Sequence, residues 1–96
     1  MPIEVDIDFQ TNASDKFLIH KKAFVPFAGS KGKIQVNPNE FDLILFGIEG
    51  APGSTATITL TPKPPATIEI SGHPIKGKIP QGRIRWGDSR IFRVKP

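Results

Sequence analysis

The chain has 96 residues with a hydrophobic fraction of 38% and a charged fraction of 23%, which indicates a globular protein and excludes a disordered one. Domains typically contain about 50–250 residues, so one domain spanning residues 1–96 is expected. The formal net charge is +4, and the absence of cysteine excludes disulfides, thiolate metal sites and cysteine nucleophiles.

Ten prolines and nine glycines leave few windows for a helix, so the chain is expected to form strands throughout. Residues 3–9 alternate hydrophobic residues with Glu4, Asp6 and Asp8. This alternation predicts a strand with carboxylates on one face. Residues 17–27 predict one or two short strands, interrupted at Lys21-Lys22 or stopped by a proline that cannot donate to a strand ladder.

The middle of the chain predicts further strands separated by turns. Residues 33–36 predict a short strand, and the Asn-Pro-Asn-Glu sequence after it predicts a turn. Residues 41–48 are apolar on both faces, which predicts a central strand covered on both sides. Residues 54–61 alternate threonines with inward-facing hydrophobic residues, and we expect them to form a long hairpin with 41–48.

The proline-rich segment 62–65 predicts an extended crossover between two sheets. Residues 66–71 then predict another strand by their alternation, and residues 72–82 predict a loop with one short strand. The last segment alternates apolar and charged residues on both sides of Gly-Asp-Ser at 87–89, which predicts a C-terminal β-hairpin over residues 82–94.

This hairpin segregates its side chains if Trp86 lies opposite Arg90. One face then carries Ile84, Trp86, Phe92 and Val94, and the other carries Arg83, Arg85, Arg93 and Lys95 together with Ile91. Trp86 would either stack on Arg90 in a cation–π contact or cap one end of the core, and we favour the core position.

Seven to nine short strands without a helix indicate a β-sandwich or a small barrel, and we favour an antiparallel β-sandwich. The outline resembles immunoglobulin-like domains, but the cysteine and tryptophan landmarks of true immunoglobulin domains are absent, so this outline implies no function. The acidic row Glu4, Asp6 and Asp8 matches the basic row in period and opposes it in sign. We therefore expect the N-terminal strand to lie beside the C-terminal hairpin, with pairs worth about 0–1 kcal/mol each.

An anionic partner is the alternative interpretation of the basic face. In a small nucleic-acid-binding β-barrel, a basic β-ribbon would contact phosphates through Arg83, Arg85, Arg93 and Lys95. Proteins that bind single strands place their aromatic side chains on the basic face, whereas the predicted hairpin turns its aromatic residues away from it. We therefore treat nucleic acid as the less favoured partner.

No catalytic or metal-binding constellation is visible. His20 and His73 are the only histidines, and no G-x-S-x-G motif accompanies them. Asp6 and Asp8 begin an alternating polar run, which lacks the glycine and the terminal glutamate of an EF-hand loop. We expect no enzymatic activity, no cofactor and no metal site.

Protein–protein contact is the favoured function. Phe24, Val25 and Phe27 precede a Gly-Ser-Lys-Gly loop and would form an apolar patch for a protein partner or a second copy if they are not fully buried. Cations flank them, so the candidate partner-binding residues are Lys21, Lys22, Phe24, Val25, Phe27, Lys31 and Lys33. A small β domain of this kind suits an accessory or decoration subunit of a larger assembly, such as a virus particle or a surface structure.

The sequence also bears on localisation. The N-terminus is acidic and lacks a long apolar core, so we expect no signal peptide. The longest apolar run is too short to cross a bilayer, so no membrane span is expected. The absence of cysteine fits the cytoplasm or a virion.

Overall fold

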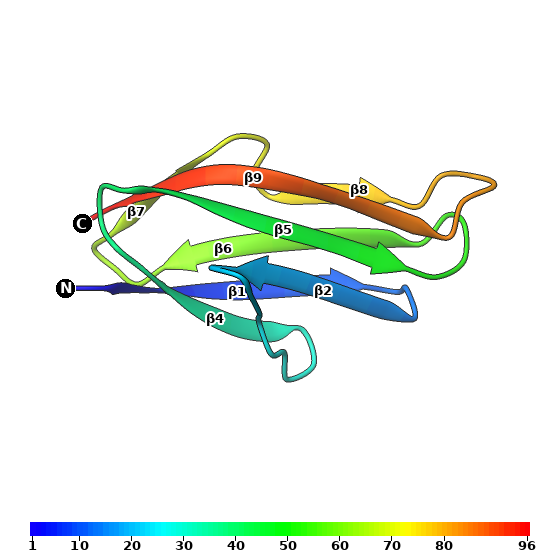
Figure 1. Cartoon of the computed structure of the whole chain (residues 1–96), viewed down its shortest axis with the longest axis horizontal. Coiled ribbons are helices and arrows are strands. Elements are labelled where there is room, and N and C mark those ends of the chain that lie inside the picture. Colours follow the sequence, from blue (N-terminus) through cyan, green and yellow to red (C-terminus); the bar gives the residue numbers. More distant parts are fainter.

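The computed structural model describes residues 1–96 and contains nine strands and no helix. One sheet has four strands in the order β4 (Lys31–Val36), β1 (Ile3–Thr11), β6 (Thr55–Pro62) and β8 (Ile75–Lys78). The other has five strands in the order β3 (Ala23–Phe24), β2 (Asp15–His20), β5 (Phe41–Glu49), β9 (Arg85–Lys95) and β7 (Thr67–Ile70). All neighbouring strands are antiparallel, and the two sheets pack face to face (Figure 1).

The predicted all-β sandwich is therefore confirmed, with a strand count inside the expected range. Since the structure has no helix, none reaches the length and hydrophobicity that crossing a bilayer would need. The molecule is elongated, with extents of 44 × 25 × 22 Å, and both chain termini lie at one end of its long axis (Figure 1).

The core lies between the sheets and is built from every second residue of the long strands. Sixteen buried hydrophobic residues form one cluster, in which Phe9 of β1, Phe46 of β5 and Phe92 of β9 are the largest side chains. Burial of each such side chain is worth about 1.5–3 kcal/mol relative to exposure. This alternation fixes which residues of each strand remain on the outside of the sandwich.

The C-terminal segment is one continuous strand, so the predicted hairpin is wrong. β9 runs along β5 from the pair Glu49–Arg85 to the pair Phe41–Arg93, and Gly87 continues the ladder opposite Gly47. The same residues lie on each face whether the segment forms a hairpin with a three-residue connection or a straight strand. Alternation alone therefore could not distinguish them, and the long apolar β5 supplies the pairing partner.

The N-terminal strand does not lie beside the C-terminal residues, which corrects a second prediction. β1 lies in the other sheet, between β4 and β6. Two of its three carboxylates pair with lysines of β4, since Lys31 Nζ lies 3.4 Å from Asp8 and Lys33 Nζ lies 3.8 Å from Glu4. The lysines of β4 alternate with the same period as these carboxylates. They thus supply the positive charges that were expected from the C-terminal arginines.

The connection between β5 and β6 crosses from one sheet to the other, so the predicted hairpin of these strands is also wrong. Just after β8, the Ile79 N–H donates to the Ser54 carbonyl and the Ile79 carbonyl accepts from the Gly53 N–H, which holds the start of β6 in the four-stranded sheet. The crossover at residues 62–65 is confirmed, because β6 and β7 belong to different sheets. The break at Lys21-Lys22 is confirmed as the turn between β2 and β3.

Trp86 lies at the edge of the core, as favoured, and not against Arg90. Its ring packs against Phe46 at a centroid distance of 5.8 Å and over Gly77 of β8, where a Cβ would overlap it. The Arg90 guanidinium instead lies 6.0 Å from the centroid of the Phe46 ring.

Candidate interaction surface on the five-stranded sheet

The middle of the outer face of the five-stranded sheet is apolar and uncovered. Along β5, Ile44 and Phe46 point into the core, and the alternate residues Phe41, Leu43 and Leu45 are exposed on the opposite side. The expectation that this strand is covered on both sides is therefore wrong for the single chain. Its position in the middle of a sheet, between β2 and β9, is as predicted.

Neighbouring strands extend the apolar surface across the sheet. Leu43 lies opposite Ile91 of β9, Leu45 opposite Ile19 of β2, and Ile19 opposite Phe24 of β3. Phe24 is 71% exposed and Ile91 is 65% exposed, and their contiguity with the residues of β2 and β5 makes them part of one apolar patch. We call this surface the sheet-face patch; it consists of Phe17, Ile19, Phe24, Phe41, Leu43, Leu45 and Ile91.

The outer face of the four-stranded sheet is polar by contrast. Threonines of β6 lie beside the carboxylates of β1, as in the pairs Asp6–Thr61 and Asp8–Thr59. Lys31 and Lys33 of β4 flank the same carboxylates. The Ser30 hydroxyl and then the Lys31 ammonium hold the pKa of Asp8 below its usual value of 3.8. Only one of the two outer sheet faces therefore exposes a group of large apolar side chains.

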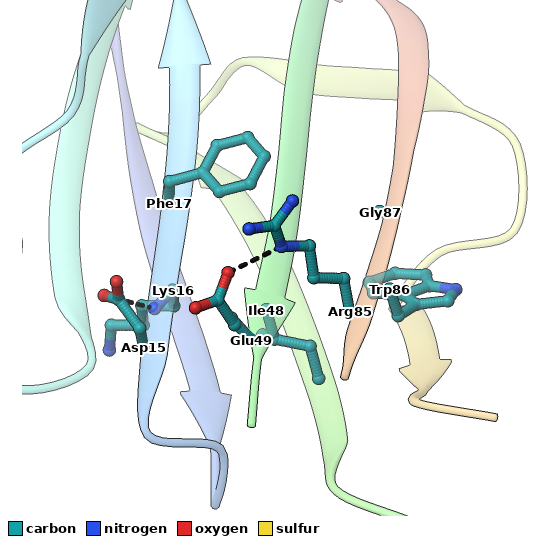
Figure 2. Close-up of a pocket in the computed structure, with 8 residues that line it drawn as sticks. All are labelled: Asp15, Lys16, Phe17, Ile48, Glu49, Arg85, Trp86 and Gly87. Carbon is teal, nitrogen blue, oxygen red and sulfur yellow. Dashed lines mark hydrogen bonds and ion pairs between the residues drawn. The ribbon is translucent and has the colours of Figure 1, made fainter. Parts of the chain in front are cut away.

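A groove crosses the apolar face at one end of the sheet. Gly47 and Gly87 lie opposite each other on β5 and β9, and neither carries a side chain to fill the space between their neighbours. A Cβ at Gly47 would lie 2.7 Å from the Phe17 ring, which leans over β5 (Figure 2). The groove has a volume of about 420 Å³, and the Arg85 Nε donates to Glu49 across 2.7 Å at its mouth.

Unpaired charges lie at the two ends of β2. Asp15, where β2 begins, lies beside the groove and pairs with no cation. Lys21 and Lys22 form the turn that follows β2 and pair with no carboxylate. Both lysines line a hollow that also contains Leu43. The apolar face therefore has an acidic corner and a basic corner.

The predicted partner-binding residues are divided among three places. Lys21, Lys22 and Phe24 lie on or beside the sheet-face patch. Val25 and Phe27 are half-buried against the core, with the Phe27 ring edge-on to Phe9 at 5.7 Å. Lys31 and Lys33 lie on the other sheet and pair with carboxylates of β1.

The predicted anion-binding residues lie on or near the outer face of β9, but most of them are paired. Lys95 Nζ lies 2.9 Å from Glu69 Oε1, and Arg93 Nη2 donates to the same carboxylate. These donors hold the pKa of Glu69 below its usual value of 4.5. Arg85 pairs with Glu49, whereas Arg83 is exposed in the loop before β9 and makes no ion pair.

The two histidines take part in separate contacts. His20 Nε2 lies 2.7 Å from Asp42 Oδ2, on the inner side of the five-stranded sheet. His73 Nε2 accepts a hydrogen bond from the backbone N–H of Leu60, which belongs to the other sheet. The His20 ring thus contacts a carboxylate of its own sheet, and the His73 ring contacts a backbone N–H of the four-stranded sheet.

The sequence analysis did not assign Phe41, Leu43, Leu45 or Ile91 to the site. The signal was visible, because residues 41–48 are apolar at odd and even positions alike. This pattern predicted that both faces of the strand are buried, whereas the odd-numbered side chains point away from the core. The function has to be argued from this geometry, because no protein-family model, no curated protein and no solved structure matches the chain.

Proposed function

We propose that this protein is a non-catalytic interaction module that binds a partner protein through the sheet-face patch. The observation that carries the proposal is the uncovered outer side of β5, where Phe41, Leu43 and Leu45 are exposed in the middle of a sheet. Contiguous apolar patches of several hundred Å² on a soluble protein mark interaction sites. An accessory or decoration subunit of a larger assembly, such as a virus particle or a surface structure, is the role that suits such a domain.

The chemistry of the patch favours a protein over other partners. Leucine, isoleucine and phenylalanine dominate its centre, and the charged residues lie at its margins. Protein interfaces have this organisation, with an apolar centre that is depleted in charge and a polar rim. The flat strand ladder also presents these side chains from a rigid scaffold, which lowers the entropy lost on binding.

Nucleic acid is the second candidate, and one contact favours it. The Arg93 guanidinium lies 4.7 Å from the centroid of the Phe41 ring, so an aromatic side chain does share the face of the β9 arginines. Stacking rings beside basic groups are typical of single-strand binders. Against this, Arg85 is paired with Glu49, and Arg93 and Lys95 share Glu69, and carboxylates on the face would repel phosphates.

The natural absence of cysteine allows a direct test of the patch. In an Ile91→Cys variant the thiol lies in the patch opposite Leu43, and in the control variant Thr61→Cys it lies on the polar sheet. Thiol-labelling rates are measured for the dilute purified proteins and for the same variants in the cells or particles where the protein occurs. We expect Ile91→Cys to be labelled at least about tenfold more slowly in the native setting, since a covered apolar patch excludes water.

The control variant is expected to be labelled at the same rate in both settings. Equal labelling of Ile91→Cys in both settings would contradict the proposal. Binding of single-stranded DNA or RNA that weakens steeply with salt, together with an unprotected thiol at position 91, would favour the second candidate.

A further inference from the structure

We propose that the partner bound by the sheet-face patch is a second copy of this chain, packed face to face about a two-fold axis that runs perpendicular to the strands. This inference rests on the proposed function, because it names the partner of the same surface. A two-fold contact requires that the patch complement itself, so that each feature at one end meets its counterpart at the other. Area and shape on this face each meet that requirement.

The exposed area is what a stable homodimer needs. With about 150–250 Å² for a fully exposed aromatic side chain, the patch offers apolar surface on the order of 600 Å². A standard interface buries about 800 Å² per partner, of which about 65% is apolar in homodimers. The patch thus accounts for the apolar part of such an interface, and the charged corners supply the rim.

The shape of the face is self-complementary along β5. Phe41 projects at one end with 71% of its surface exposed, and the groove beside Gly47 and Gly87 lies at the other end. An axis that crosses β5 between Ile44 and Leu45 brings the level of Phe41 in one copy to the level of Ile48 in the other. Each Phe41 ring then enters the groove of the opposite copy, and the two contacts form together.

Filling the groove, with rescue by a second variant, tests the dimer and its orientation. Gly87→Leu places a side chain in the groove, and Phe41→Ala removes the ring that would enter it. We expect sedimentation equilibrium to give the unaltered chain a dimer Kd in the micromolar range or below, and each variant a Kd at least about tenfold higher, because the contact occurs twice per dimer. Mixing the two variants should restore association as a heterodimer, in which the Phe41 ring of one copy meets the open groove of the other, identified by its intact mass in native mass spectrometry.

Circular dichroism and thermal unfolding of each variant establish that the fold is intact, since both positions are exposed. A chain that stays monomeric up to about 1 mM would overturn the second-copy proposal. A dimer that tolerates both substitutions, or variants that fail to associate when mixed, would overturn it as well.

These outcomes are separable from failure of the proposed function. A monomeric chain whose Ile91→Cys thiol is still protected in the native setting would remove the second copy and retain a different protein partner. A thiol that is labelled equally in concentrated, dilute and native samples would remove both. Protection that rises with the concentration of the purified variant would support the second copy.

Discussion

Single glycines decide where the large rings of this protein lie. Gly77 of β8 faces the core at a position where any Cβ would overlap the Trp86 indole. Gly47 serves the same purpose on the outer face, where the Phe17 ring occupies the space of the missing side chain. Because both glycines have ordinary strand backbone, the requirement is for room and not for a special conformation.

The first prediction concerns Gly77. A Gly77→Ala substitution should displace the indole of the only tryptophan and cost about 1–3 kcal/mol of unfolding free energy, as overpacking in a core usually does. Intrinsic fluorescence should shift to longer wavelength as the indole meets water, and urea denaturation gives the loss of stability. The exposed neighbour Lys76 provides the control, since Lys76→Ala should leave the emission unchanged. An unshifted spectrum in Gly77→Ala would disprove the packing role of this glycine.

At the scale of whole strands, charge pairing joins β7 to β9 at the edge of the five-stranded sheet. The Glu69 carboxylate lies 2.9 Å from the Lys95 ammonium and 3.1 Å from the Arg93 guanidinium, and both cations belong to the neighbouring strand. Hydrogen bonds from Lys95 and then Arg93 lower the pKa of Glu69. A carboxyl group with a lowered pKa in the folded state binds protons more weakly there than in the unfolded chain, so it stabilises the fold when ionised.

This gives a prediction with a defined sign. The stabilisation from Glu69 is fully present above its ordinary pKa of 4.5 and disappears as the pH falls through the lower pKa of the folded state. Glu69→Gln should therefore reduce the urea midpoint at neutral pH, and the difference from the unaltered chain should shrink to zero in acid. Glu40→Gln is the control, because Glu40 is exposed and forms no ion pair. A difference that persists unchanged at low pH would mean that the effect is not electrostatic.

The strands and their faces were predictable from the sequence because a period of two needs no knowledge of the neighbours. Which strands pair with one another was not predictable from the sequence. The acidic row of β1 is complemented equally well by lysines of β4 and by arginines of β9, and exposed pairs are too weak to choose between them. The predicted hairpin at residues 82–94 failed for a related reason, since the continuous strand β9 displays the same residues on each face.

The candidate site shows a different limit. The apolar odd-numbered residues of β5 could be recognised in the sequence. The sequence pattern is the same, however, whether these side chains pack against another part of the chain or against another molecule. Only the sheet order, which leaves Leu43 and Leu45 without a layer above them, distinguishes the two. Phe24 was identified as a candidate because it stands next to a loop, whereas the fold joins it to Ile19 in the centre of the patch.

At the scale of the whole molecule, the sandwich has one polar outer face and one apolar outer face. A dimer through the apolar face would place a third layer of side chains against β5 and leave the threonine and carboxylate face of the other sheet exposed. Such an assembly links folding to association, so the melting temperature of the unaltered chain should rise with protein concentration.

The last prediction concerns Phe41, which projects from the patch. Phe41→Ala should change the unfolding free energy of the monomer by no more than about 1 kcal/mol, because the ring is mostly exposed and its main contact is with Arg93. The dimer Kd should rise at least about tenfold, since buried aromatic anchors dominate interface energies. The rise of melting temperature with concentration should therefore disappear. Ile84→Ala is the matched control, because Ile84 is equally apolar and 60% exposed but lies in the loop before β9, off the patch. If Ile84→Ala weakened association as much as Phe41→Ala, the interface would lie at the loop end of the sandwich and not on the sheet face.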